Sequence, residues 1–212
     1  MKLSVFGATG MVGKHVVHQA LAKGYTVNAF GRNVEIFFNE EEENHNLHAI
    51  KGYVFDETEV YNTIAGSDAV ISVLGGSFDG KDKTRSLGIK NIIKQMEKAH
   101  VNRIIALGGM GILNAPGKDT LLLHSHAYPA EFLPVGLEHE EAYNYLKQSN
   151  LNWTFVCSPD IIDAHATGSF VTNKDFEPTP NNYKINAGDL AFFMLNELQK
   201  NEYVKHRVGI SN

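Results

Sequence analysis

Three glycines follow a short apolar segment at the start of the chain. Residues 2–6 favour a β-strand, and Gly7, Gly10 and Gly13 come directly after it. Glycine at these positions lets the chain turn tightly out of a strand, bring its backbone against a pyrophosphate and pack the next helix close to the sheet. The free N–H groups at the start of that helix then bind phosphate without a basic side chain. The pattern predicts a dinucleotide-binding turn.

Three glycines alone occur in many loops, so the residues around the turn have to decide whether it binds a dinucleotide. These residues support the prediction. Val12, Val16 and Ala20 recur at helical spacing after the turn, and Gly24 stands where a helix ends. A second strand is predicted at 26–30. The alternative is a structural turn that binds no nucleotide.

Strands and helices alternate along most of the chain. Helices are predicted between the strands, most clearly at 84–100, where apolar residues form one stripe. This alternation is typical of an α/β fold with a doubly wound parallel sheet, whose ligands bind at the carboxyl ends of the strands. We expect a single domain over residues 1–212. The predicted strands lie at 2–6, 26–30, 47–51, 69–74, 102–107 and 152–157.

The last third of the chain departs from this alternation. Residues 158–168 are interpreted as a loop, and short strands are predicted at 169–172 and 183–185. A helix is expected to begin at Asn186, and a final strand at 208–211 is placed at the edge of the sheet. These small C-terminal elements are expected on the substrate side of the fold.

Composition and charge exclude several classes of partner. The net charge is −5 without a basic stripe, so nucleic acid is not expected to bind, and the acidic run 40–43 is interpreted as a solvated face or loop. No apolar run approaches the roughly 20 residues of a membrane span, and no leader segment is recognised. The histidines, His124 and His126 included, match no metal pattern. Cys157 is the only cysteine, which fits a reducing cytoplasm.

Arg32 stands directly after the second predicted strand, where dinucleotide-binding folds recognise the adenosine ribose. An acid at this position favours NAD(H) and repels a 2′-phosphate, whereas arginine offers a planar charged fork to that phosphate. NADP(H) is therefore the preferred cofactor. The alternative is a surface arginine in a protein that also accepts NAD(H).

Five segments resemble one protein family, in the same order along nearly the whole chain. The family is the atypical short-chain dehydrogenase/reductases, and the likeness is strongest to the flavin reductase and biliverdin-IXβ reductase branch, with the nitrogen-metabolite-repression (NmrA-like) regulators as neighbours. The turn motif and the strand that carries Trp153 point to the family rather than to a substrate. The segments are Gly7–Gly13, Gly31–Asn33, Asp68–Ile71, Leu151–Thr154 and Asp189–Met194.

This resemblance implies a Rossmann-type domain that binds NADP(H) along the strand ends. Many relatives have Gly-Asp-Val after the third strand, whereas this chain has Gly52–Tyr53–Val54, so the aspartate's hydrogen bond to the adenine is missing or replaced. Tyr53 either stacks on the base or is an ordinary surface residue. The predicted cofactor-binding residues are Gly7, Thr9, Gly10, Met11, Val12, Gly13, Arg32, Asn33, Val54, Leu74, Gly75, Gly108 and Gly109.

Tyr143 and Lys147 match the Tyr-x-x-x-Lys spacing of standard short-chain dehydrogenases, in which tyrosine donates a proton and lysine lowers its pKa. We interpret the match as accidental, because in relatives that retain the pair both residues stand earlier on the helix. The positions in this chain that correspond to that tyrosine and lysine hold Val135 and His139. Lys147 is interpreted as a solvated residue at a helix end.

His139 is the catalytic candidate. It shares a helical face with Ala142 and Leu146, so a neutral or protonated imidazole there is expected to touch the cofactor or relay a proton. The alternative is a partly buried histidine that is hydrogen-bonded to backbone.

The segment 108–111 stands where many relatives carry a catalytic serine, and it offers no hydroxyl. Related flavin and biliverdin reductases need little acid catalysis, since an electron-poor acceptor has mainly to be stacked on the reduced nicotinamide. Met110, Phe132 and Pro159 are predicted to shape a flat apolar slot for this small-molecule acceptor. The alternative is that these three residues only pack in the core.

The resulting hypothesis is an NADPH-dependent oxidoreductase that passes hydride to a flat conjugated acceptor such as a flavin, tetrapyrrole or quinone. A catalytically silent NADP(H) sensor that regulates a partner is the second hypothesis, because the Tyr–Lys pair is missing. A sugar-nucleotide epimerase or dehydratase is the third, and the absent proton donor counts against it. The oligomeric state is not predicted.

Overall fold

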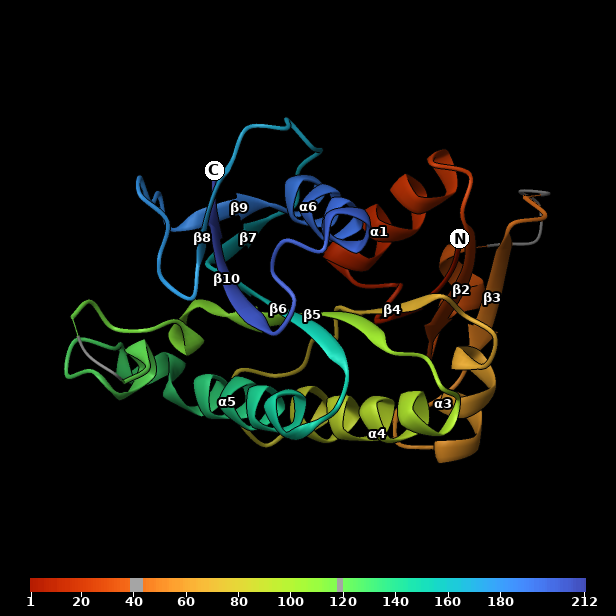
Figure 1. Cartoon of the computed structure of the whole chain (residues 1–212), viewed down its shortest axis with the longest axis horizontal. Coiled ribbons are helices and arrows are strands. Elements are labelled where there is room, and N and C mark those ends of the chain that lie inside the picture. Colours follow the sequence, from red (N-terminus) through yellow and green to blue (C-terminus); the bar gives the residue numbers. More distant parts are fainter. Residues whose placement is uncertain (39–43, 118–119) are drawn as a thin grey trace.

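Eight strands form one central, mostly parallel sheet (Figure 1). The computed structural model describes residues 1–38, 44–117 and 120–212, so the acidic run 40–43 lies outside the described residues. The strand order is β3-β2-β1-β4-β5-β6-β10-β8, and only β8 runs antiparallel to its neighbour. The strands are β1 (Lys2–Phe6), β2 (Thr26–Gly31), β3 (Leu47–Lys51), β4 (Ala69–Ser72), β5 (Arg103–Gly109), β6 (Asn152–Ser158), β8 (Val171–Lys174) and β10 (His206–Ser211).

Helices cover both faces of this sheet. In Figure 1, α1 and α6 lie above it and α3, α4 and α5 below it. The helices are α1 (Met11–Ala22), α2 (Val34–Phe37), α3 (Glu57–Ile64), α4 (Thr84–Lys98), α5 (Leu133–Gln148) and α6 (Ala187–Lys200). Since the strand order reverses direction between β1 and β4, the predicted doubly wound α/β fold is confirmed.

A separate apolar core lies against each face of the sheet. Below the sheet, Ile92 and Met96 of α4 and Leu146 of α5 pack against strand residues such as Ile104, and all four side chains are fully buried. Above it, the buried stripes of α1 and α6 pack against the opposite strand side chains. The strands are therefore apolar on both faces, as the sequence predicts for a covered parallel sheet.

Two predictions for the last third of the chain are wrong. The final strand, β10, is not at the edge, because it pairs with β6 on one side and with β8 on the other. Part of the expected 158–168 loop forms a short strand, β7 (Asp160–Ile162), which pairs with β9 (Lys184–Asn186) in a separate two-stranded sheet. Pairing between distant strands depends on tertiary contacts that local sequence patterns do not record.

The buried carboxylate of Asp189 organises these C-terminal elements. Its Oδ1 accepts hydrogen bonds from the backbone N–H groups of Thr167 (2.8 Å) and Gly168 (2.7 Å), and its Oδ2 accepts one from the Asn212 amide (2.9 Å). Asn186 is the first residue before α6, as predicted, but its side-chain amide donates to Asp189 and makes no hydrogen bond to the helix backbone. The segment that follows β7 is thereby fixed to the start of α6.

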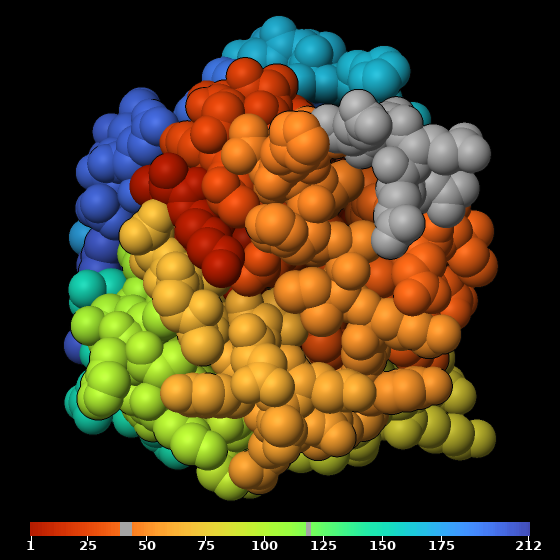
Figure 2. Space-filling model, turned by 90° about the vertical axis from the view of Figure 1, so that its right-hand side faces the viewer, coloured from red at the N-terminus to blue at the C-terminus, as the bar shows by residue number. Residues whose placement is uncertain are grey.

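The first third of the chain gathers at one end of the molecule. Figure 2 shows this end, where residues coloured red to gold cover most of the visible face.

Among the described residues, no helix is both long enough and apolar enough to cross a membrane.

Candidate functional site

The turn after β1 is built so closely that side chains are excluded from it. Gly7 has a φ of +83°, and a Cβ on it would lie 2.5 Å from the carbonyl oxygen of Val73. A Cβ on Gly13 would overlap the carbonyl oxygen of Gly7. Gly10 donates its N–H to that same oxygen at 3.0 Å and is the residue before α1. The three glycines thus perform the steric roles that the sequence predicts for a dinucleotide-binding turn.

The first turn of α1 leaves its backbone N–H groups available. No side chain caps this helix and no acidic residue occupies its first turn, so the positive end of the helix dipole is not neutralised locally. Met11 is 45% exposed, whereas Val12 is buried in the core, so only the backbone of Val12 faces the turn. This arrangement suits an anion such as a pyrophosphate.

Arg32 and Asn33 lie directly after β2 and are both exposed. The residue before them, Gly31, is close to Thr9: a Cβ on Gly31 would lie 3.5 Å from the Thr9 hydroxyl oxygen. The end of β2 therefore lies beside the glycine turn. Arg32 is in the position that a group attached to the adenosine ribose would approach.

The side chains of Val54, which follows β3, and Leu74, which follows β4, both lie against Gly88 of α4. A Cβ on Gly88 would lie 2.7 Å from Cδ1 of Leu74 and 3.3 Å from Cγ1 of Val54, so a glycine in the helix makes room for both side chains. Gly75 comes next and is exposed. Tyr53 has a 61% exposed side chain, and its backbone N–H donates to Glu59 at 2.7 Å, so the ring is available on the surface beside this pair.

The two glycines at the end of β5 serve different purposes. A Cβ on Gly108 would overlap the ring of Phe155 on β6, so Gly108 is required for packing within the sheet. A Cβ on Gly109 would lie 2.9 Å from Cδ2 and 3.3 Å from Nε2 of His139. The imidazole of His139 therefore lies directly on the Gly109 backbone, at the carboxyl end of the strand.

His139 is neutral in this position. Burial and the nearby charge of Arg85 lower the pKa of its imidazole to about 3, so the protonated form considered from the sequence does not exist at physiological pH. Its Nδ1 is buried and has no hydrogen-bond partner among the described residues, unlike the backbone-bonded histidine of the alternative interpretation. The neutral imidazole has one N–H to donate and one nitrogen to accept.

A polar cluster beside His139 was not predicted from the sequence. The Glu138 carboxylate is buried, accepts a hydrogen bond from the Ser86 hydroxyl at 2.6 Å and forms an ion pair with Lys83, which links α5 to the start of α4. Arg85 donates to the carbonyl oxygens of Gly76 and Ser77, each at 2.9 Å, and so holds the loop after β4. Glu138 lies in a run of acidic residues that is typical of a solvated helix face.

The three predicted substrate residues lie on different segments of the chain. Met110 and Pro159 follow Gly109 and Ser158, which are paired across β5 and β6, so both lie at the same end of the sheet. The Asn181 amide lies 3.7 Å from the Met110 sulfur. Phe132 is 41% exposed on the short helix η3 (Ala130–Phe132), which precedes α5.

Tyr143 packs against aromatic residues of β6, and Lys147 is exposed. The Tyr143 ring stacks on Phe155 with centroids 6.0 Å apart and meets Trp153 edge-on at 5.8 Å, so it lies between α5 and the sheet. The guanidinium of Arg207 lies 5.1 Å from its centroid. Lys147 is exposed in the last turn of α5.

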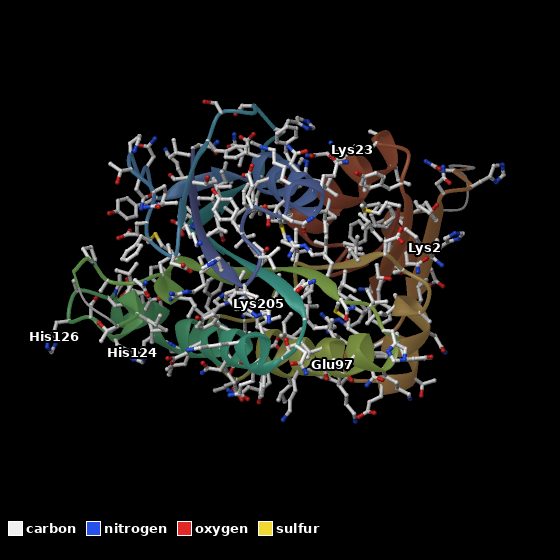
Figure 3. All side chains as sticks on the ribbon, in the orientation of Figure 1. Lys2, Lys23, Glu97, His124, His126 and Lys205 are labelled. Carbon is white, nitrogen blue, oxygen red and sulfur yellow. The ribbon has the colours of Figure 1, made fainter. Side chains whose placement is uncertain are left out.

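His124 and His126 lie at the left end of the molecule in Figure 3. His124 contacts Glu140 through Nε2 at 2.8 Å, and His126 is exposed on the loop beyond it. Within the described ranges, no group of three or more histidine, cysteine or carboxylate side chains is arranged to hold a metal ion.

Comparisons with known proteins agree on one kind of domain. Residues 7–201 match the protein family described as NAD(P)H-binding. The protein YwnB of Bacillus subtilis (strain 168), whose function is uncharacterised, is 26% identical over 216 residues, which cover 99% of this chain and 98% of YwnB.

Two solved structures resemble the whole chain. A candidate NADH-flavin reductase from Streptococcus pneumoniae is 27% identical with a TM-score of 0.83, and the likeness covers 100% of this chain and 99% of that one. A candidate epimerase from Bacteroides thetaiotaomicron is 30% identical with a TM-score of 0.84 and coverage of 99% and 96%. The predicted resemblance to atypical short-chain dehydrogenase/reductases is thereby confirmed at the level of fold and cofactor class.

Proposed function

The chain belongs to the NAD(P)H-binding family, and we propose that it is a reductase that passes hydride from NAD(P)H to a flat conjugated acceptor such as a flavin, quinone or tetrapyrrole. The observation that carries the proposal is the end of β5, where Gly109 has no side chain and the neutral imidazole of His139 lies against its backbone. Such a surface suits stacking of a planar acceptor, whose reduction depends on position more than on acid catalysis. The likeness to a candidate NADH-flavin reductase supports the same acceptor class.

The described residues fit a bound dinucleotide. Gly7 and Gly13 allow the turn to pack closely against neighbouring backbone, and the uncapped N–H groups of α1 would bind the oxygens of a pyrophosphate. Val54, Leu74 and Gly75 would contact the adenosine side, and Gly109 with His139 would border the nicotinamide. When bound, the reduced nicotinamide supplies the hydride. The protein's own contribution is to hold the two rings together and to exclude water from between them.

Arg32 supports a preference for NADP(H). Its guanidinium follows β2 on the exposed side of the turn, where it would pair with a 2′-phosphate by charge-assisted hydrogen bonds. NAD(H) remains the alternative cofactor, and the Streptococcus neighbour is described with NADH.

A non-enzymatic sensor is the second candidate function. It is favoured by the position of Tyr143, whose ring packs between α5 and the sheet, and by the exposure of Lys147, which together leave no Tyr–Lys pair at the strand ends. A sensor needs the dinucleotide-binding turn and a partner that it regulates, but it needs no binding site for a hydride acceptor. The epimerase-like neighbour shares the fold, while the neutral His139 gives little support to the acid–base steps of an epimerase.

One assay separates these functions. Purified protein is mixed with NADPH or NADH and with flavin mononucleotide, a quinone or biliverdin, and the loss of reduced-nicotinamide absorbance is followed. Acceptor-dependent oxidation above the rate without protein supports the reductase. Cofactor binding by nicotinamide fluorescence without oxidation of any acceptor favours the sensor, and absence of binding contradicts both.

A further inference from the structure

Tyr128, in the segment between β5 and α5, lies close to the end of β5. In Figure 1 this segment, coloured green, lies beyond that strand and leads into α5, and His126, labelled in Figure 3, lies two residues before the tyrosine. The phenol tip of Tyr128 lies between two glycines. A Cβ on Gly111 would lie 2.7 Å from its hydroxyl oxygen, and a Cβ on Gly136 would lie 3.0 Å from it. Both separations are shorter than ordinary van der Waals contact, so glycine on both sides admits the hydroxyl group.

The two glycines place this hydroxyl next to the proposed nicotinamide site. Gly111 is two residues beyond Gly109, and Gly136 is three residues before His139, which is about one turn of α5. The Tyr128 hydroxyl, which lies against Gly136 of α5, and the imidazole of His139, one turn later on α5, therefore both lie beside the segment 109–111. The segment 108–111 itself carries no side-chain hydroxyl.

The Tyr128 hydroxyl forms no hydrogen bond with another described residue, and it is not among the fully buried polar atoms, so it is open to a ligand or to solvent. Nδ1 of His139 also lacks a partner there. A buried polar atom without a protein partner, such as this Nδ1, usually indicates a ligand or solvent that completes it. Partial burial raises the pKa of Tyr128, so the phenol keeps its proton near neutral pH and remains a donor.

We propose that Tyr128 is the proton donor of the reductase and that its acceptor is therefore a conjugated carbonyl compound, such as a quinone or diketone. This proposal rests on the proposed function and narrows its acceptor class. The carbonyl carbon gains the hydride that reduced nicotinamide supplies, the π electron pair of the C=O bond moves to oxygen, and that oxygen takes the Tyr128 proton. The nicotinamide is oxidised and the carbonyl becomes an alcohol. Water then returns a proton to the phenolate, whose ring is partly exposed.

The test compares Tyr128→Phe with the unmodified protein on two acceptors, 9,10-phenanthrenequinone as carbonyl and flavin mononucleotide as flavin. Phenylalanine keeps the ring between Gly111 and Gly136 and removes only the hydroxyl. We expect kcat with the quinone to fall by about 100-fold, as is typical for loss of a general acid, while the Kd for NADPH is unchanged. The activity with flavin mononucleotide is expected to stay within about twofold of that of the unmodified protein, because reduction of the flavin does not depend on the Tyr128 proton.

Two further variants make the result specific. Gly111→Ala fills the slot and is expected to reproduce the quinone-selective loss by displacing the phenol. Tyr145→Phe removes a hydroxyl that donates to Glu141 on the same helix, and it is expected to leave both activities unchanged. Unchanged quinone turnover in Tyr128→Phe, or equal losses on both acceptors, overturns the role of Tyr128.

The behaviour of the unmodified protein separates this proposal from the proposed function. Reduction of flavin mononucleotide without reduction of the quinone overturns the carbonyl acceptor and leaves the reductase standing. Binding of NADPH without oxidation by either acceptor contradicts the reductase itself, and the role of Tyr128 falls with it.

Discussion

Gly13 lies against the carbonyl group of Gly7, so closely that any Cβ on Gly13 would overlap the carbonyl oxygen. This contact joins the first turn of α1 to the end of β1. Because of this contact, no side chain at position 13 can lie between the backbone and the expected pyrophosphate. The dinucleotide-binding turn is therefore sensitive even to replacement of this glycine by alanine.

Gly13→Ala is expected to weaken cofactor binding severely and to lower stability by about 1–3 kcal/mol, because the added methyl group pushes the helix from the strand. Thermal unfolding and NADPH fluorescence titration measure the two effects. Gly75→Ala is the control for stability, since a Cβ there meets no atom within 4 Å. An unchanged melting temperature in Gly13→Ala would show that the helix can shift freely.

Arg32→Ala is expected to weaken NADPH binding by roughly 10- to 100-fold, the equivalent of one or two charge-assisted hydrogen bonds, and to leave NADH binding nearly unchanged. Lys51→Ala is a matched control, because Lys51 is an exposed cation at the end of the neighbouring strand β3 and lies 3.7 Å from Glu35. Isothermal titration with both cofactors measures the ratio. Equal weakening of NADPH and NADH contradicts a role for Arg32 in binding the 2′-phosphate.

Glu138→Ala is expected to cost about 1–3 kcal/mol of unfolding free energy, because the Ser86 hydroxyl and Lys83 lose a buried acceptor. Glu57→Ala removes an ion pair with Lys94 that is more than half exposed on both sides, so it should cost clearly less unfolding free energy than Glu138→Ala. Urea denaturation of both variants measures the difference. Equal costs would mean that the link between α4 and α5 contributes no more than a surface pair.

Tyr143→Phe and Lys147→Ala are expected to leave kcat within about twofold of the unmodified protein, because both residues lie outside the proposed reaction site. The same acceptor assay applies to both variants, with thermal unfolding as a check that each is folded. A loss of 100-fold or more in either one would restore the Tyr-x-x-x-Lys interpretation.

Local patterns were sufficient for the dinucleotide-binding turn and the main strands. The glycine spacing predicts the turn because its requirement is steric and local, and the alternation of strand and helix predicts a covered parallel sheet. The predicted strand at 102–107 differs from β5 by two residues at its end, where Gly108 and Gly109 continue the ladder. Such differences at element ends are expected, since side-chain patterns weaken there.

Contacts between distant segments could not be read from the sequence. Glu138 meets Ser86 across 52 residues, and Tyr128 reaches Gly111 only because the intervening segment folds back. No periodicity records such encounters, and an acidic residue within an acidic run is ordinarily solvated. The position of β10 between β6 and β8 was missed for the same reason, because pairing partners are chosen by the assembled sheet.

The stability of the protein at acid pH is expected to depend on the buried imidazole of His139. The pKa of His139 is about 3 in the folded state, against an ordinary value near 6.5, so between these values the unfolded chain binds a proton that the folded chain excludes. Stability from this residue is complete above pH 6.5 and declines progressively as the pH falls toward 3. His139→Gln removes this dependence, so its melting temperature should fall less steeply than that of the unmodified protein between pH 6.5 and 4. His126→Gln is the control, because His126 is exposed. Parallel curves for the unmodified protein and His139→Gln would mean that the imidazole is solvated, and its position on Gly109 would then have to be abandoned.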